Sequence, residues 1–182
     1  MRRELNNVIS VAHSIFRFAL LKMVHMKSLS VHGIERFSPN VVFEMNKGAI
    51  VNIGEKVRVH SGSKIKVRKG GRVVIESGVK INYNCIIVCH KSIQIGEGTE
   101  FGPSVYIYDH DHDFRAGLKA NKFKEAPVKI GKNCWIGANT VILRGATIGD
   151  GCVIAAGSVV TGNVPNHTIY IQKRQTQVTK IL

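Results

Sequence analysis

Aromatic residues are scarce in this chain: they make up 7% of its 182 residues, and tryptophan occurs once. Large aromatic side chains usually contribute much of a thick globular core. Hydrophobic residues as a class nevertheless reach 44%, close to the share in ordinary soluble domains. The composition therefore predicts a single folded domain with a narrow interior.

Cysteine is also rare, and no two cysteines stand in the CxxC spacing of a zinc ribbon. The four are Cys85, Cys89, Cys134 and Cys152. Three of them occupy the inward fifth place of a six-residue repeat, and we interpret the cysteines as small core residues in a reducing compartment. Cys89 falls outside that pattern, and the sequence gives no account of it. The chain has no GxSxG nucleophile elbow either. Together these absences argue against covalent catalysis by a serine or cysteine nucleophile.

Acidic residues are outnumbered, because 12 Asp and Glu face 26 Lys and Arg, which gives a net charge of +14. This balance favours anionic partners but does not name one. No recognised nucleic-acid-binding motif accompanies the charge, and aromatic residues are not interleaved with the basic ones. Nucleic acid is therefore not expected as a partner.

An aliphatic residue returns at every sixth position near the C-terminal end, at Ile130, Ile136, Ile142, Ile148, Ile154 and Val160. The fourth place of each six is Asn133, Asn139, Gly145, Gly151, Gly157 or Asn163. Asn and Gly reach positive φ at little cost, so a turn is predicted at each fourth place. The fifth place holds only small or slim side chains, as expected where a residue points into a narrow space.

The same period continues upstream, with short insertions, through Ile53, Val59, Ile65, Ile75, Ile81, Ile87, Ile95, Phe101 and Ile107. Each six supplies a short strand and a turn, and three of them close one triangular coil. Residues 18 apart then stack at one sheet spacing, about 4.8 Å, which places Cys134 beneath Cys152. A single coil cannot bury its own apolar edge, whereas stacked coils can, so the pattern predicts a parallel β-helix. Its handedness does not follow from the spacing.

Residues 1–29 are predicted to form an amphipathic helix, because polar residues mark one stripe and apolar residues fill the rest. The polar stripe is Arg3, Asn6, Asn7, Ser10, Ser14 and Arg17. Arg17 and Lys22 interrupt the apolar run, which makes it too short for a membrane span, and no signal-peptide cleavage site follows. The chain is therefore expected in the cytoplasm. The helix either caps the open end of the β-helix or lies on an anionic membrane through its basic residues, and both roles are compatible.

Three segments carry a resemblance to a known family: KINYNCIIV (80–88), PSVYIYDHDHDF (103–114) and GKNCWIGANTVILRGATIGDGCVIAAGSVVTGNVP (131–165). They resemble the hexapeptide-repeat acyltransferases over about residues 50–165, and most of all the maltose, galactoside and capsular or exopolysaccharide sugar O-acetyltransferases. The resemblance implies a left-handed β-helix over residues 30–165, with residues 166–182 as a tail. It also implies a homotrimer with acyl-CoA bound between subunits.

An excursion loop is expected at residues 113–127, directly after Asp109, His110, Asp111 and His112. Loops of this length in compact folds are usually functional. Transfer of an acyl group to a sugar hydroxyl needs a base, and histidine suits that role near neutral pH. The resemblance places the family's catalytic histidine on His112, in the sixth position of its repeat, with His110 as the alternative. Asp109 and Asp111 are expected at the acceptor or beside the imidazole.

The resemblance implies further contacts. Asn82 would bind the acceptor or help to hold the histidine. The cofactor-binding residues would be Trp135, Gly137, Ala138, Ala156 and Thr161, with Lys173 and Arg174 at the phosphates. The chain departs from the family after Thr161, because many relatives have Lys and later a GxPA segment where this chain has Gly162 and then NHTIYIQKRQTQ.

These observations predict an acetyl-CoA-dependent O-acetyltransferase that modifies a sugar of a surface polysaccharide or its precursor, in a ternary complex and without a metal. N-acetylation of an amino sugar or nucleotide sugar is the alternative within the same chemistry. Two other classes stay open. One is a γ-type carbonic anhydrase, with His90 as a third metal ligand beside His110 and His112, and the other is a non-catalytic β-helix.

Overall fold

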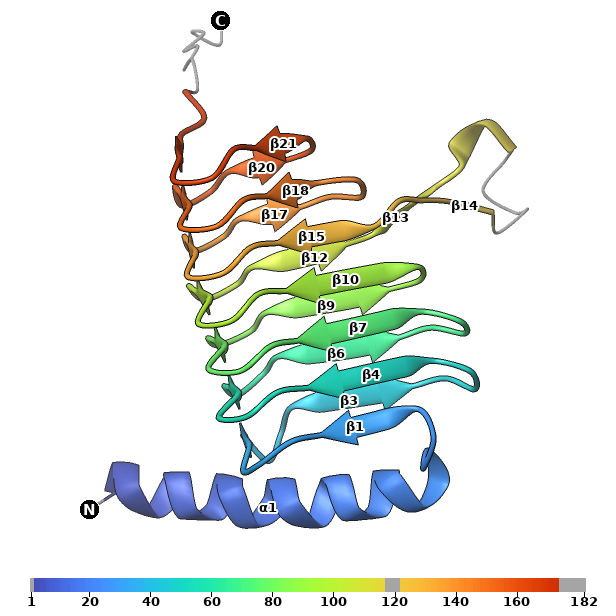
Figure 1. The fold of residues 1–182 in the computed structure, drawn as a ribbon, viewed down its shortest axis with the longest axis vertical. Helices are drawn as coiled ribbons and strands as arrows, with labels where there is room; N and C mark the ends of the chain where they lie inside the picture. The colour runs from blue at the N-terminus through green and yellow to red at the C-terminus, as the bar shows by residue number, and fades with distance from the viewer. Residues whose placement is uncertain (1, 117–121, 174–182) are drawn as a thin grey trace, which may run out of the picture.

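The computed structural model describes residues 2–116 and 122–173 (Figure 1). One helix, α1 (Arg2–Val24), lies across the end of a column of stacked strands. Three parallel sheets run along the column, and a separate two-stranded hairpin projects from its side. The predicted parallel β-helix is confirmed.

The strands fall into three sheets, which we number in the order in which the chain visits them. Sheet 1 contains β1 (Leu29–Val31), β4 (Ile50–Ile53), β7 (Arg72–Ile75), β10 (Ser92–Ile95), β15 (Val128–Ile130), β18 (Thr147–Ile148) and β21 (Asn163–Val164). Sheet 2 contains β2 (Arg36–Phe37), β5 (Arg58–Val59), β8 (Lys80–Ile81), β11 (Glu100–Phe101), β16 (Trp135–Ile136), β19 (Val153–Ile154) and β22 (Ile169–Tyr170). Sheet 3 contains β3 (Val42–Met45), β6 (Lys64–Val67), β9 (Ile86–Cys89), β12 (Tyr106–Tyr108), β17 (Val141–Ile142) and β20 (Val159–Val160).

Strand register follows the sixfold period. Ile136 pairs with Ile154 and Ile142 pairs with Val160, each 18 residues on. Every aliphatic or aromatic residue of the predicted series is at most 3% exposed, and the fifth-place residues are buried beside them. Parallel backbone hydrogen bonds and stacked aliphatic side chains therefore form the core together.

The turns also follow the predicted pattern, with one exception. Asn133, Asn139 and the three fourth-place glycines all have positive φ. Asn163 instead opens strand β21, so the predicted turn at this position is wrong. The β-helix also continues past residue 165, because β22 pairs with β19.

The excursion begins earlier than expected. Strand β13 (His110–His112) already pairs antiparallel with β14 (Phe123–Glu125), and a short 3-10 helix, η1 (Phe114–Ala116), follows β13. Residues 110–112 have therefore left the coil, and the sixth-place register assigned to His112 is wrong. Two corners of the prism matter below. We call the corner between sheets 3 and 1, where β13 and β14 leave, the hairpin corner, and that between sheets 2 and 3 the small-residue corner.

Helix α1 caps the first coil. Phe18 is buried, and its ring packs edge-on against Phe37 and Phe43. The hydroxyl of Ser14 accepts a hydrogen bond from the backbone N–H of Phe37 over 2.8 Å. The segment Glu4–Val24 is nevertheless long and apolar enough to cross a membrane, contrary to the expectation that its apolar run is too short.

We predict that Phe18→Ala destabilises the first coil by about 3 to 5 kcal/mol, the usual effect of truncating a buried Phe. Phe16 is the matched control, because it lies on the same helix and is 65% exposed. Phe16→Ala should change the free energy of unfolding by less than about 0.5 kcal/mol. Urea unfolding combined with hydrogen exchange of the first-coil amides measures both, and equal effects would contradict the packing described.

Candidate active site

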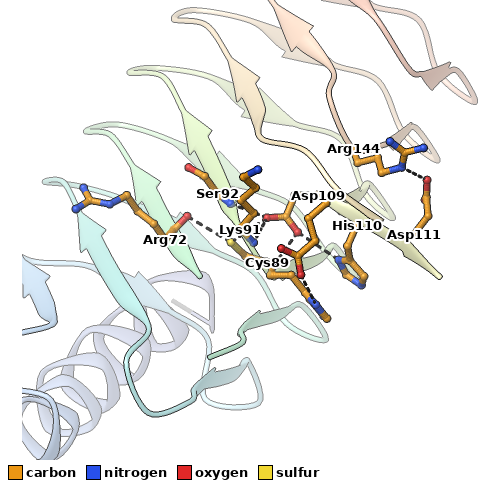
Figure 2. A network of polar contacts seen from close by, with 10 residues as sticks. Arg72, Cys89, Lys91, Ser92, Asp109, His110, Asp111 and Arg144 are labelled. Atoms are coloured by element: carbon orange, nitrogen blue, oxygen red, sulfur yellow. Dashed lines mark hydrogen bonds and ion pairs between the residues drawn. The ribbon is translucent and has the colours of Figure 1, made fainter. Parts of the chain in front are cut away.

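Asp109 anchors the hairpin corner from inside. It follows β12 and is completely buried. Its carboxylate accepts hydrogen bonds from the backbone N–H groups of His90, Lys91 and Ser92 at 2.7 to 2.8 Å (Figure 2). In a regular coil these N–H groups would pair with backbone carbonyl groups of the next coil, but here the chain leaves the coil as the hairpin. The carboxylate of Asp109 therefore replaces the missing backbone acceptors. Of the two places expected for Asp109, the structure shows the one beside an imidazole, because its Oδ1 lies 3.2 Å from Nδ1 of His110.

Cys89 now has a structural role, which the sequence did not reveal. Its thiol lies 3.3 Å from Asp109 Oδ2 and 3.3 Å from the carbonyl oxygen of Arg72. Burial, and then the neighbouring carboxylate, raise the pKa of Cys89. All four cysteines are free and buried. A neutral, buried thiol is a poor nucleophile. For Cys85, Cys134 and Cys152, burial agrees with the predicted role as core residues.

His110, the first residue of β13, is packed where the hairpin leaves the coil. Its Nδ1 lies 3.2 Å from Asp109 Oδ1, and its ring stacks on that of His90 with centroids 3.7 Å apart. Phe123 of β14 packs against both rings. Burial, and then the charge of His110, lower the pKa of His90, while Glu125 lies 3.5 Å from its Nδ1. This packing fixes the root of the hairpin.

His112 lies farther along β13 and is exposed. Its ring contacts Phe123, with centroids 4.7 Å apart. Among the described residues, no hydrogen bond to the imidazole of His112 occurs, so both ring nitrogens remain available to a ligand. Of the two histidines proposed as the base, His112 is the accessible one and His110 the packed one.

Asp111 and Arg144 connect the hairpin to the next coil. Asp111 Oδ2 accepts a hydrogen bond from Arg144 Nε (Figure 2). Arg144 was not identified from the sequence, although the strand register contains the signal. Ile107 pairs with Ile142. Arg144, two residues after Ile142, therefore stacks on the position of Asp109, where the hairpin leaves the coil. The carboxylate of Asp111, expected at the acceptor, is therefore engaged with this guanidinium.

The small-residue corner is a flat column. Residues Gly137 and Ala138 follow β16, and Ala156 follows β19. A Cβ atom at Gly137 would meet the backbone nitrogen of Ala156 at 2.5 Å, so only glycine fits this contact. Ala156 itself is exposed and Ala138 half-buried. Asn82 lies at the same corner, after β8, and its side-chain oxygen accepts the N–H of Tyr83 over 2.8 Å.

The other predicted cofactor residues are spread over the surface. Trp135 lies on the outer face of sheet 2 and is 48% exposed. Thr161 is exposed after β20, on the side of the hairpin corner, and is thus separated from Gly137 and Ala156. Lys173 is exposed, and Arg174 lies outside the described residues.

Within one chain, the histidines and the small-residue corner do not meet. His110 and His112 leave the prism between sheets 3 and 1, opposite the face of sheet 2 that carries Trp135. The corner with Gly137 and Ala156 is one side of the prism away. In residues 2–116 and 122–173, no three His, Cys, Asp or Glu side chains are placed to hold a metal ion. The rings of His90 and His110 stack face to face rather than pointing their nitrogens at one centre.

We predict that Asp109→Ala lowers the free energy of unfolding by more than about 3 kcal/mol, because three backbone N–H groups lose their acceptor. Asp111→Ala should cost at most about 1 kcal/mol, since it removes a half-exposed ion pair. Urea unfolding gives both values. Hydrogen exchange at residues 90–92 should accelerate in Asp109→Ala and not in Asp111→Ala, and unchanged exchange in the first variant would refute the anchoring role.

Comparison with known proteins agrees with this geometry. Residues 127–162 match the family of bacterial transferase hexapeptide repeats (six repeats). Nodulation protein L of Rhizobium leguminosarum is 48% identical over 74 residues, which cover 38% of this chain and 37% of the relative. Galactoside O-acetyltransferase of Escherichia coli is 37% identical over 89 residues, which cover 48% of this chain and 44% of the relative. The chain spans less than half of the length of these curated relatives.

A solved structure shows the fold directly. A variant of the N-acyltransferase AntD from Bacillus cereus, in complex with dTDP and coenzyme A, matches with a TM-score of 0.69 and 22% identity. The match covers 81% of this chain and 82% of that chain. The coils are left-handed, as the resemblance implied. By its repeats, its fold and its relatives, this chain is similar to the bacterial transferase hexapeptide family, whose repeats its residues 127–162 match.

Proposed function

We propose that the protein transfers an acetyl group from acetyl-CoA to a sugar hydroxyl, with His112 as the general base. The observation that carries this proposal is the contrast at the hairpin corner. His112 presents an accessible imidazole, whereas His110, His90 and Asp109 are packed beneath it and fix the strand from which it projects. The acetyltransferase named among the relatives acts on a galactoside, and the AntD structure contains coenzyme A.

The chemistry follows from the role of a base. An imidazole nitrogen of His112 accepts the proton of the hydroxyl group as its oxygen attacks the thioester carbonyl. When the tetrahedral intermediate collapses, the C–S bond breaks and His112 returns the proton to the departing thiolate. No acyl-enzyme is needed, which agrees with the buried state of the cysteines.

We predict that His112→Ala lowers kcat by at least about 100-fold, the usual contribution of a general base, with little change in acetyl-CoA binding. His110→Ala should affect kcat less and stability more, because its ring is packed. Acceptor-dependent release of CoA thiol measures kcat, and calorimetry measures binding. The reverse ranking of the two variants would move the base to His110.

The acceptor we propose is negatively charged, as in a capsular, lipopolysaccharide or exopolysaccharide precursor. A cavity of about 690 Å³ lies between the N-terminal half of α1 and sheet 2. Arg36, Arg58 and His60 line it together with Tyr83, and none of its described lining residues is acidic. A basic, hydroxyl-rich cavity suits a phosphorylated or acidic sugar.

N-acetylation of an amino sugar is the second candidate, because the AntD enzyme is named an N-acyltransferase. The two outcomes differ in the stability of the product. Mild alkali or hydroxylamine releases the acetyl group from an ester and leaves an amide intact. A screen of nucleotide sugars and oligosaccharides, followed by this treatment of the labelled product, separates O-transfer from N-transfer.

We further propose that each active site is shared between two chains of a homotrimer. The support for a shared site is the separation between the hairpin corner and the small-residue corner of one chain. One six-residue side of the prism, which spans at most about 20 Å, separates His112 from Gly137 and Ala156. A closed cyclic trimer brings the hairpin corner of one chain to the small-residue corner of the next three times over. Coenzyme A would lie along that column of small residues, with Trp135 beside it.

We predict that two inactive variants complement each other in mixed trimers. His112→Ala removes the base, and Ala156→Trp blocks the column at an exposed position, so both chains should still fold. Co-refolding the two should restore activity, because some interfaces then combine an intact His112 with an intact Ala156. Trimers of each variant alone are the controls. Mixed trimers shown by mass spectrometry to form and yet remain inactive would refute the shared site.

A further inference from the structure

A helix that only capped the β-helix would turn its apolar side toward the first coil. In α1 most of the large apolar side chains point away from it. Two polar residues of the stripe face the β-helix: Ser14 is 1% exposed and bonded to Phe37, and Arg17 Nη2 donates to the carbonyl oxygen of Pro39 over 2.7 Å. Phe18 is the buried aromatic residue on that side. The large exposed apolar side chains cover the rest of the helix surface: Leu5, Val8, Ile9, Ile15, Phe16, Leu20, Met23 and Val24. Ile9 and Ile15 lie at the edge of this surface, where they also line hollows against the β-helix. We call these eight residues the outer face of α1.

The outer face is long, continuous and open. A 23-residue helix is about 35 Å long, and the outer face runs along nearly all of it. The helix lies across the end of the column, with the whole β-helix on its other side (Figure 1). A flat surface can therefore meet α1 without touching the hairpin or the small-residue corner. Exposed apolar patches of this extent mark interaction sites.

The charges near the outer face favour an anionic surface. Lys22, in the last turn of α1, and Lys27, three residues after the helix, are both exposed, and Lys22 Nζ also donates to the carbonyl oxygen of Val31 over 3.4 Å. Glu4 is the acidic residue that α1 contributes. The whole chain carries a net charge of +14. An apolar helical face flanked by basic residues is typical of helices that lie in the interface of a bilayer.

We propose that α1 docks the protein on an anionic lipid bilayer, with its outer face in the acyl-chain boundary and its axis in the membrane plane. The in-plane arrangement follows from the polar stripe. Ser14, Arg17 and Phe18 bind the first coil, so the helix cannot cross a bilayer without detaching from the β-helix. This docking is independent of the reaction that the hairpin corner catalyses.

Flotation with preformed vesicles tests the proposal. The purified chain should float with vesicles of phosphatidylcholine and phosphatidylglycerol, and less with phosphatidylcholine alone. Phe16→Asp and Leu20→Asp should each weaken binding at least about tenfold, because a lost apolar contact of this size is worth that factor. Ile169→Asp is the matched control, since Ile169 is equally exposed at the opposite end of the β-helix and should leave binding unchanged. Circular dichroism verifies that each variant is folded.

Fluorescence quenching by brominated lipids tests the geometry. The chain has one tryptophan, Trp135, on sheet 2 and away from α1, so the unmodified protein is its own control. In Phe16→Trp, the new tryptophan should be quenched most by bromine near the headgroup end of the acyl chain, and Trp135 should not be quenched.

Three results would overturn the proposal. They are equal vesicle binding by Phe16→Asp and the unmodified chain, strongest quenching by bromine at the methyl end of the acyl chain, and no flotation at all. Sedimentation velocity adds a fourth. A smaller assembly for Phe16→Asp, with unchanged vesicle binding, would assign the outer face to contacts between copies of the chain.

Discussion

Stacking of equivalent residues in successive coils is the constraint on which the rest of this structure depends. An inward aliphatic residue such as Ile136 packs on Ile154 while their backbones share the hydrogen bonds of a parallel ladder. Each residue type at a corner is thereby repeated as a column along the prism. The contact of Gly137 with the backbone of Ala156 is one such column, and it is close because both residues are small. The column along which we propose that coenzyme A lies thus arises from the same repetition that builds the core.

The hairpin is the place where this repetition is interrupted, and Asp109 makes the interruption possible. When residues 110–112 leave the coil, the N–H groups of His90, Lys91 and Ser92 lose the backbone acceptors that the next coil supplies elsewhere. The carboxylate of Asp109 takes their place, at distances of 2.7 to 2.8 Å. Unpaired buried N–H groups are costly, so the departure of the hairpin from the coil depends on this one carboxylate.

The sequence predicted the features that depend on periodicity. The buried series, the 18-residue register and most turns follow from spacing alone, because a regular stack leaves few alternatives. Features that depend on a departure from the period were predicted less well. The alternation of Asp and His could not reveal that Asp109 points inward while His112 is exposed. The same alternation is also typical of a loop that is solvated throughout. Arg144 was missed because its role becomes visible only when the register places it above the hairpin.

The helix shows a different limit. The helix itself was predicted from the sequence, but an amphipathic pattern does not say which face meets the protein, and Phe18, assigned to the apolar side, packs on the β-helix beside Ser14. Here backbone groups at the open end of the first coil decide the outcome, because the N–H of Phe37 and the carbonyl of Pro39 need polar partners and Ser14 and Arg17 supply them. The apolar side is left exposed as a consequence. Polar satisfaction of a β-helix end has thus turned a capping helix outward, and this exposed apolar face is what the proposed docking on a bilayer uses.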